Sequence, residues 1–235
     1  MAMGRALGAG FAALMALAAL AAPCFAADAA HPTVIELFQS QGCSSCPPAE
    51  ANVAAISERA DILALAFEVD YWDRLGWKDT FSRPAWTARQ YGYAHAMGHD
   101  GVYTPEVVVN GRLEGDGLEA GELASLVSRG DRGAGGPEVS FSGGAVRIAA
   151  GAAPAGGAEV WLARYIPSTL QVPIPRGENA GRTLPYKDVV REMVLLGHWH
   201  GAAASFPLPA GEPGLAEAAI VQAAGAGPIL AASRR

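Results

Sequence analysis

Two apolar segments flank an amphipathic one in the first part of the chain. Residues 33–38 (TVIELF) and 62–69 (ILALAFEV) are rich in β-branched and aromatic side chains, which predicts two buried strands. Between them, residues 49–60 place Val53 and Ile56 at helical spacing. A strand, a helix and a second strand with short connections are typical of a parallel α/β unit.

Helical and extended patterns continue to alternate up to residue 128. Pro84 suits a first helical turn and Gly98 suits a helix end, so we predict a helix between them. Asn110-Gly111 is the strongest short hairpin signal in the chain. The predicted elements are a helix over residues 82–97, a strand over 106–109, a hairpin at 110–111 and a helix over 119–128.

A glycine-rich, charged stretch at residues 129–137 (RGDRGAGGP) then predicts a domain boundary. Beyond it, short β-like runs alternate with Pro and Gly turns, as in a small sandwich. We therefore expect a leader over residues 1–30, an α/β domain over 31–130 and a small all-β, sandwich-like domain over 137–235. The predicted strands of the last domain are residues 139–141, 145–149, 159–166, 188–196, 203–206, 218–222 and 229–232.

The start of the chain has the composition of an export signal. Arg5 precedes an apolar run over residues 6–22, and small residues around Ala26 suit a signal peptidase. For a membrane anchor the run is short and poor in Leu and Ile, and Pro23 before Cys24 fits a lipoprotein signal poorly. We therefore predict cleavage after Ala26 or a few residues later, a periplasmic or secreted protein, and no stable membrane insertion after cleavage.

Net charge and composition limit the classes of partner that this protein is expected to bind. The net charge of −6 and the isoelectric point near 5.4 provide no basic surface for nucleic acid or anionic lipid, so we expect no nucleic-acid partner. With 51% hydrophobic residues, the chain can bury one or two ordinary cores.

Removal of the leader leaves one pair of cysteines out of three, Cys43 and Cys46. Cys-x-x-Cys at a helix start places two thiols one turn apart, close enough to form a disulfide. The helix N-terminus favours the thiolate of Cys43 as the nucleophile, and Cys46 would resolve the mixed disulfide. A purely stabilising bridge is the alternative, but closing a four-residue loop is worth only about 2 kcal/mol, against about 4.7 kcal/mol for a hundred-residue loop.

Two prolines complicate the position of this pair. Pro47 and Pro48 directly follow Cys46, and a residue before proline is pushed out of the helical region. Both cysteines could therefore lie in a turn ahead of the helix, which would weaken the effect of the helix dipole on Cys43.

Three stretches of the chain carry a family resemblance: VIELFQSQGCSSCPPAE, ALAFEVDYWDRLGWKDTFSRPAWTARQ and GVYTPEVVVNGR. They resemble an exported bacterial thioredoxin-like family that is known only as a domain of unknown function. The later stretch RGENAGRTLPYKDVVREM is similar to a second block of that family, so the resemblance covers nearly all of the mature chain.

The wider resemblance to thioredoxins implies a role for Thr104 and Pro105. In that superfamily a cis-proline precedes the strand that faces Cys-x-x-Cys, and the residue before it pairs its backbone with the bound peptide. We therefore predict a cis Pro105, although a trans-proline at a strand start is commoner in general.

Glu36, on the strand that leads to the cysteines, is a candidate for exchanging a proton with Cys46. Its spacing of seven residues before Cys43 leaves open that it faces away. The charged residues of the loop over 70–80 are interpreted as solvated, and its aromatic residues as core packing or the wall of a groove. The polar loop from Arg176 to Arg182 either joins strands or docks the two domains.

The leading hypothesis is a periplasmic thiol-disulfide oxidoreductase that needs no cofactor and exchanges disulfides with exported proteins. Its candidate catalytic residues are Cys43, Cys46, Thr104, Pro105 and Glu36. Two alternatives remain open. One is a copper-binding protein or metallochaperone, since paired thiolates are soft ligands, with a third ligand from His95 or His99. The other is a non-enzymatic binding module with a fixed disulfide.

Overall fold

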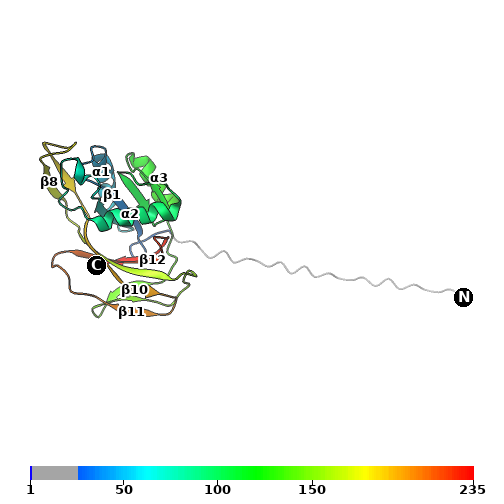
Figure 1. Cartoon of the computed structure of the whole chain (residues 1–235). Helices are drawn as coiled ribbons and strands as arrows, with labels where there is room; N and C mark the ends of the chain where they lie inside the picture. The colour runs from blue at the N-terminus through cyan, green and yellow to red at the C-terminus, as the bar shows by residue number, and fades with distance from the viewer. Residues whose placement is uncertain (2–25) are drawn as a thin grey trace.

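The computed structural model describes residue 1 and residues 26–235 and shows a mixed α/β protein built on one large sheet (Figure 1). The helices are α1 (Cys46–Ile56), α2 (Pro84–Met97), α3 (Ala120–Gly130) and the short 3-10 helix η1 (Asp73–Leu75). The strands are β1 (Thr33–Gln39), β2 (Ile62–Glu68), β3 (Glu106–Val109), β4 (Leu113–Gly115), β5 (Val139–Ser142), β6 (Ala145–Ile148), β7 (Ala158–Ile166), β8 (Leu170–Ile174), β9 (Arg182–Tyr186), β10 (Val189–Trp199), β11 (Ala204–Pro207), β12 (Ala216–Ala223) and β13 (Ile229–Arg234). The large sheet has the order β13-β12-β7-β10-β2-β1-β3-β4.

Strand β1 organises the N-terminal part of this sheet. It pairs in parallel with β2 along its whole length and antiparallel with β3 on its other side. Side chains of a strand alternate between two faces. Ile35 and Leu37 pack with α1 and α3, whereas Val34 and Phe38 pack with α2. Helix α2 therefore covers one face of β1, and α1 and α3 cover the other.

Helix α1 begins earlier than its apolar spacing predicts. Its first residue is Cys46, and Pro47 and Pro48 occupy the following positions, where the missing N–H of proline costs no helical hydrogen bond. Cys43 lies in the turn before the helix. The two cysteines therefore lie on either side of the helix start, and the helix ends at Ile56 rather than at residue 60.

The other predicted elements of the N-terminal part are confirmed within two residues. Gly98 ends α2 with a left-handed φ of 75°, which glycine adopts easily. The predicted hairpin joins β3 to β4 through Asn110 and Gly111. The Asn110 side chain also accepts from the Val34 N–H (2.9 Å) and donates to the Gly130 carbonyl (3.0 Å), which ties the hairpin to β1 and α3.

The strands after residue 137 differ from the separate sandwich domain that the sequence predicts. β7, β10, β12 and β13 continue the large sheet, because β10 joins β2 in parallel at Val189 and Ala66. β5, β6 and β11 form a second sheet that packs on this end of the large one around Val146, Trp199 and Val221. The packing is sandwich-like, but one of its sheets is shared with the α/β part. All seven predicted strands are present within three residues of their expected bounds.

A two-stranded sheet made of β8 and β9 is absent from the sequence prediction. Each strand contains one proline, Pro173 or Pro185, and a proline argues against a strand because it cannot donate to the ladder. Both prolines are exposed on this isolated hairpin, where no further strand needs their missing N–H groups. The hairpin stands beside α1 at the upper end of the molecule in Figure 1.

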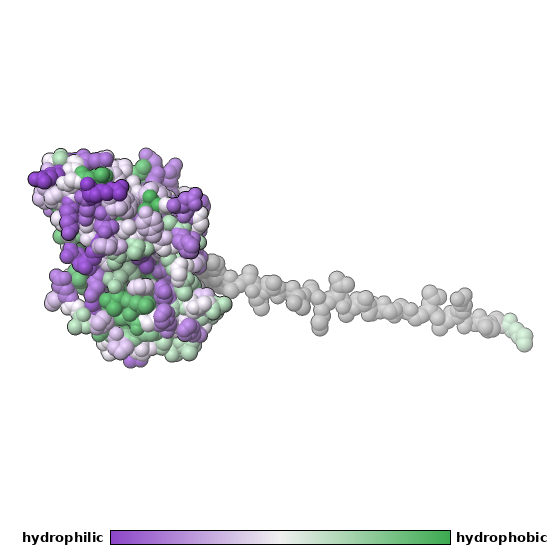
Figure 2. All heavy atoms as spheres, in the orientation of Figure 1, coloured by the Kyte–Doolittle hydropathy of each residue, from purple (hydrophilic) through white to green (hydrophobic). Residues whose placement is uncertain are grey.

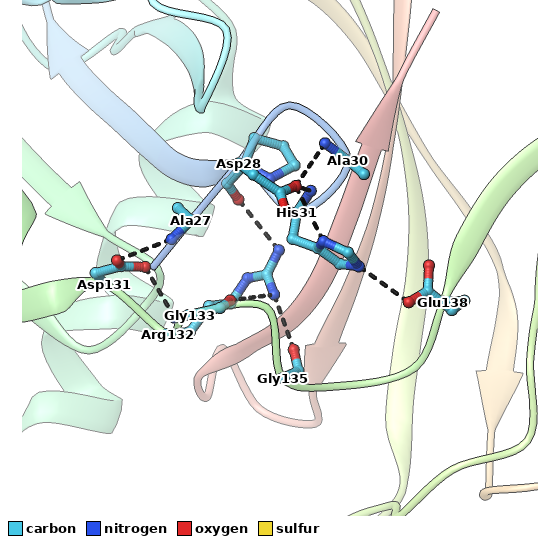
Figure 3. Close-up of polar contacts among 10 residues, drawn as sticks. Ala27, Asp28, Ala30, His31, Asp131, Arg132, Gly133, Gly135 and Glu138 are labelled. Atoms are coloured by element: carbon cyan, nitrogen blue, oxygen red, sulfur yellow. Dashed lines mark hydrogen bonds and ion pairs between the residues drawn. The ribbon is translucent and has the colours of Figure 1, made fainter. Parts of the chain in front are cut away.

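The predicted boundary at residues 129–137 is cross-linked to the start of the described chain (Figure 3). The Asp131 carboxylate accepts from the Ala27 N–H (3.1 Å), and Arg132 donates to carbonyls on both segments. The His31 ring lies 3.0 Å from the Glu138 carboxylate. This segment is therefore a structured junction rather than a free linker.

The predicted export segment at residues 6–22, together with Cys24, lies outside the described residues. Among the residues that are described, no helix is both long enough and apolar enough to cross a bilayer.

Candidate functional site at the cysteine turn

The cysteine turn, residues 40–46, connects the end of β1 to the start of α1. Cys43 and Cys46 form a disulfide there, with Cα atoms 5.5 Å apart. The Cys43 N–H donates to the Ser40 carbonyl (3.0 Å), and the Cys46 N–H donates to the Cys43 carbonyl (3.3 Å). Cys46 is the first residue of α1, so the disulfide lies at the helix end whose N–H groups favour a thiolate.

Both cysteines are buried. Cys43 exposes none of its surface and Cys46 exposes 2%. Ser44 and Ser45 between them are exposed, and the Ser45 hydroxyl lies 3.3 Å from the Cys43 sulfur. Solvent therefore reaches the serines of the turn but not the Cys43 sulfur.

The loop between β8 and β9 covers the turn. The buried Asn179 amide donates to the carbonyls of Gln41 (3.0 Å) and Cys43 (2.9 Å). The Glu178 carboxylate accepts from the Ser44 N–H (3.0 Å) and hydroxyl (2.6 Å). The polar loop from residue 176 to 182, whose role the sequence left open, is thus a direct neighbour of the disulfide.

Two tryptophans of the loop after β2 contact the same turn. Trp77 donates to the Gln41 side chain (3.0 Å). Trp72 packs against Gly42 and donates to the Thr104 hydroxyl (2.8 Å). The peptide bond between Thr104 and Pro105 is cis, as predicted. Trp72 therefore connects Thr104 to the cysteine turn, while the predicted contact of Thr104 with a partner peptide stays a prediction.

Glu36 does not lie with the cysteines. Its carboxylate accepts two hydrogen bonds of 2.6 Å from Arg89 and one of 2.8 Å from Tyr93, both on α2. Glu36 alternates with Ile35, which packs on the α1 side, so its own side chain faces α2. The spacing of seven residues before Cys43 thus places this carboxylate on the other face of the sheet, in a buried ion pair.

Other carboxyl groups lie on the cysteine side. Glu50 follows Cys46 by one helical turn and is buried on the same face of α1. It accepts from the Gln39 side chain (2.5 Å) and the Lys187 N–H (2.8 Å). Glu68, at the end of β2, pairs in register with Gln39, and among the described residues neither of its carboxyl oxygens has a hydrogen-bond partner.

Burial shifts the pKa values of Glu50, Glu68 and Asp79, here called the acidic group. It raises the pKa of Glu50 to about 7. Burial, and then the neighbouring Asp79 charge, raise the pKa of Glu68 well above its usual range. The pKa of Asp79 is also raised by burial, against hydrogen bonds that favour its ionised form. Burial and the Asp79 charge therefore favour the protonated form of Glu68, and Glu50 can gain or lose a proton near neutral pH.

The sequence contains one signal for these residues that the prediction missed. Glu50 lies four residues after Cys46, and residues with this spacing share one helix face. Asp79 was interpreted as part of a solvated loop, but the structure buries it, and it accepts from the backbone N–H groups of Gln41 (2.7 Å) and Phe81 (2.8 Å). Only the tertiary structure shows that Glu68 faces the same side.

The histidines proposed as third copper ligands lie away from the cysteines. His95 is exposed on α2, which covers the face of β1 opposite α1. His99 lies 3.9 Å from Glu114. Within residues 26–235, no cluster of three or more His, Cys, Asp or Glu side chains is arranged to hold a metal ion. The structure therefore does not bring a histidine ligand to the cysteine pair.

A separate groove of 520 Å³ lies between α2 and the C-terminal strands. Trp86, Trp161 and Met193 line it, with Arg89 and Gln222 as polar neighbours. On the face shown in Figure 2, apolar side chains gather over the strands around β10. None of the residues that line the groove belongs to the cysteine turn.

Comparison with known proteins places the chain in a family. The crystal structure of a protein from Agrobacterium tumefaciens is similar, with 31% sequence identity and a TM-score of 0.71, and the match covers 88% of this chain and 94% of that one. Among curated proteins, none matches. The family described as protein of unknown function (DUF1223) matches residues 34–222, which include the cysteine turn, the acidic group and the covering loop. The chain therefore belongs to this family of proteins of unknown function.

Proposed function

We propose that this protein is an exported, thioredoxin-like thiol-disulfide oxidoreductase that acts on the thiols or disulfides of other exported proteins. The position of the disulfide carries the proposal, because Cys43 and Cys46 meet at the start of α1 beside protonatable carboxyl groups. A bridge that closes so short a loop adds only about 2 kcal/mol through chain entropy. A role in disulfide exchange therefore explains the position of the Cys43–Cys46 bridge better than a role in stabilising the fold does.

The surrounding elements support a thioredoxin-like arrangement. β1, α1 and β2 form a parallel unit with the cysteine pair at the start of its helix. β3 pairs antiparallel with β1, and Thr104 and Pro105 directly precede it. Trp72 joins Thr104 to the cysteine turn, so the segment before β3 and the disulfide belong to one site.

The proposed exchange is a two-step transfer of a pair of electrons. A partner thiolate attacks the Cys43 sulfur, the Cys43–Cys46 bond breaks, and its electron pair leaves on Cys46 as a thiolate. A second partner thiolate then attacks the partner sulfur of the mixed disulfide and releases Cys43. The partner loses two electrons and two protons, the protein gains them, and the reverse reaction follows the same steps.

Glu50 takes the proton-transfer role that the sequence assigned to Glu36. It lies one turn from Cys46 on the buried face of α1, and its pKa of about 7 lets it donate and recover a proton near neutral pH. Burial raises the pKa of the neighbouring Glu68 well above its usual range, so this group can restore the proton that Glu50 loses. A buried Cys46 thiolate would otherwise remain uncompensated after the first step.

Contacts at the start of the described chain support the export proposal. Cleavage after Ala26 would make Ala27 the mature N-terminus, and its nitrogen lies 3.1 Å from the Asp131 carboxylate. The new ammonium group would form an ion pair there. Mass spectrometry of protein recovered from the periplasm should give a mature chain that starts at Ala27, and full-length protein retained in the cytoplasm would contradict export.

The complete burial of Cys43 is the observation that favours a second candidate, a binding module with a fixed disulfide. In that case the cysteines only hold the turn in shape. Their replacement by serine would lower stability but leave the cellular task of the protein intact.

One pair of measurements separates the two candidates. The reduction potential of the Cys43–Cys46 pair in the mature protein is expected within the range of known oxidoreductases, about −270 to −120 mV. A Cys46→Ala variant produced with its leader should accumulate mixed disulfides on Cys43 in cells, with a Cys43→Ala/Cys46→Ala double variant as the matched control. A potential below about −300 mV, with no mixed disulfides above the control, would establish the fixed-disulfide module instead.

A further inference from the structure

The loop at residues 175–181, here called the cap, lies over the turn that carries the buried Cys43. Glycines with left-handed φ values stand near its two ends, Gly177 at 82° and Gly181 at 80°. Gly177 packs close to Trp77 and Gly42, where a Cβ would lie 3.4 and 3.8 Å from their atoms. The cap therefore lies directly on the cysteine turn.

The cap and its supporting hairpin are held by different forces. Below the cap, β8 and β9 pack into an apolar cluster with Val172, Ile174, Leu184 and Tyr186 at its centre. The cap itself is held mainly by the polar contacts of Glu178 and Asn179. Because water and peptide groups can replace polar contacts but not the apolar packing, the cap can leave while the hairpin stays in place.

The hydrogen-bonding groups of the cysteine turn that contact the cap are of the kind that a bound peptide could satisfy. Asn179 donates to two backbone carbonyls, those of Gln41 and Cys43. Glu178 accepts from the backbone N–H and hydroxyl of Ser44. The turn thus presents two carbonyl acceptors, on Gln41 and Cys43, followed by two donors on Ser44, and a polypeptide can supply the complementary N–H and C=O groups.

We propose that the cap is an internal stand-in for the partner polypeptide: the segment of an exported protein that carries the reacting cysteine displaces the cap and takes its hydrogen bonds on Gln41, Cys43 and Ser44. The proposal rests on the oxidoreductase function proposed above. It explains how a buried Cys43 can react, and it makes the site selective, because a small thiol gains nothing that offsets the lost cap contacts whereas a peptide replaces them.

The first test measures access to the disulfide. Dithiothreitol should reduce the Cys43–Cys46 bond of Glu178→Gln and Asn179→Ala about tenfold faster than that of the wild type, since one variant removes the charge that accepts from Ser44 and the other removes two neutral hydrogen bonds. Gln171→Ala, on the exposed surface of β8, is the matched control and should react at the wild-type rate. Thermal unfolding of every variant shows whether its fold is retained, and the exposed position of Glu178 keeps that variant informative if Asn179→Ala unfolds.

The second test asks whether a peptide replaces the cap. Cys46→Ala protein is joined through Cys43 either to an extended cysteine-containing decapeptide or to 2-mercaptoethanol, and amide hydrogen exchange is followed in residues 175–181. The peptide adduct should exchange faster in the cap than the mercaptoethanol adduct, while β8 and β9 stay equally protected. Equal exchange in the two adducts would overturn the peptide stand-in.

The outcomes separate this inference from the function on which it rests. If dithiothreitol reduces the cap variants at the wild-type rate, the cap is no gate, whatever the reduction potential proves to be. If the cap variants react faster but Cys46→Ala traps no exported protein in cells, the gate is established and the oxidoreductase function fails.

Discussion

Two buried carboxyl groups lie on opposite faces of the β1–β2 pair, and their surroundings differ in one decisive respect. Glu36 receives three hydrogen bonds from Arg89 and Tyr93 and forms an ion pair with Arg89. Glu68 is equally buried, but among the described residues it forms no ion pair and its oxygens have no hydrogen-bond donor. Burial alone therefore does not decide the role of a carboxyl group, since the partner decides whether it anchors the fold or holds a proton.

The largest effect is expected for Glu36→Gln. This change leaves the Arg89 guanidinium buried without its counter-charge, which costs about 3–5 kcal/mol of unfolding free energy. Urea denaturation at pH 7 measures the loss. A change below 1 kcal/mol, within the range of ordinary surface substitutions, would mean that the pair is not the anchor described above.

A smaller effect, and one that depends on pH, is expected for Glu50. Its pKa rises from 4.5 to about 7 on folding, so the folded state binds its proton more tightly than the unfolded state. The stability from this group is fully present below pH 4.5 and is lost as the pH rises through 7, by roughly 3 kcal/mol. The Glu50→Gln variant should lose less stability between pH 4.5 and pH 8 than the wild type.

Urea denaturation at half-unit pH steps checks this prediction, and the difference between the two curves isolates Glu50 from the other titrating groups. An Asp116→Asn variant, which changes an exposed carboxylate, provides the control and should follow the wild-type curve. Parallel curves for Glu50→Gln and the wild type would remove Glu50 from the proton-transfer role.

The smallest effect is expected for Glu68→Gln, which is the same chemical change as Glu36→Gln on the other face. Burial and Asp79 raise the pKa of Glu68 well above its usual range, which favours its neutral form. An amide of the same shape should therefore change the unfolding free energy by less than about 1 kcal/mol. If Glu68→Gln destabilised the protein as strongly as Glu36→Gln, the two faces would not differ as described.

The sequence predicted elements correctly where the deciding residues are close together along the chain, and it failed where the deciding contacts are distant in sequence. The strand over residues 106–109 and the helix ended by Gly98 are confirmed, because periodicity and end signals act within a few residues. The β8–β9 hairpin was missed because Pro173 and Pro185 argue against strands wherever a sheet continues on both sides. The separate sandwich was expected because composition shows a boundary at residues 129–137 but not which strands pair across it.

At the candidate site, too, local sequence signals were predictive and contacts between distant segments were not. Cys43 and Cys46 were identified from spacing alone, and the cis bond at Pro105 was expected from a resemblance. For Glu36 the spacing left open which face it occupies, because a shift of one residue along a strand turns the side chain to the opposite side of the sheet, and the structure places it on the α2 side. Its replacement, Glu50, carried a signal in its spacing from Cys46.

The sequence by itself determined most of the strands and helices and the Cys43–Cys46 pair near the start of a helix, because each depends on residues that are neighbours along the chain. Only the tertiary structure decided that Asn179, 136 residues beyond Cys43, closes over it, and that Glu68 shares its buried surroundings with Asp79. Hydrogen bonds and charges act through space over a few ångströms, and the sheet that brings these segments together is formed by strands from both ends of the chain.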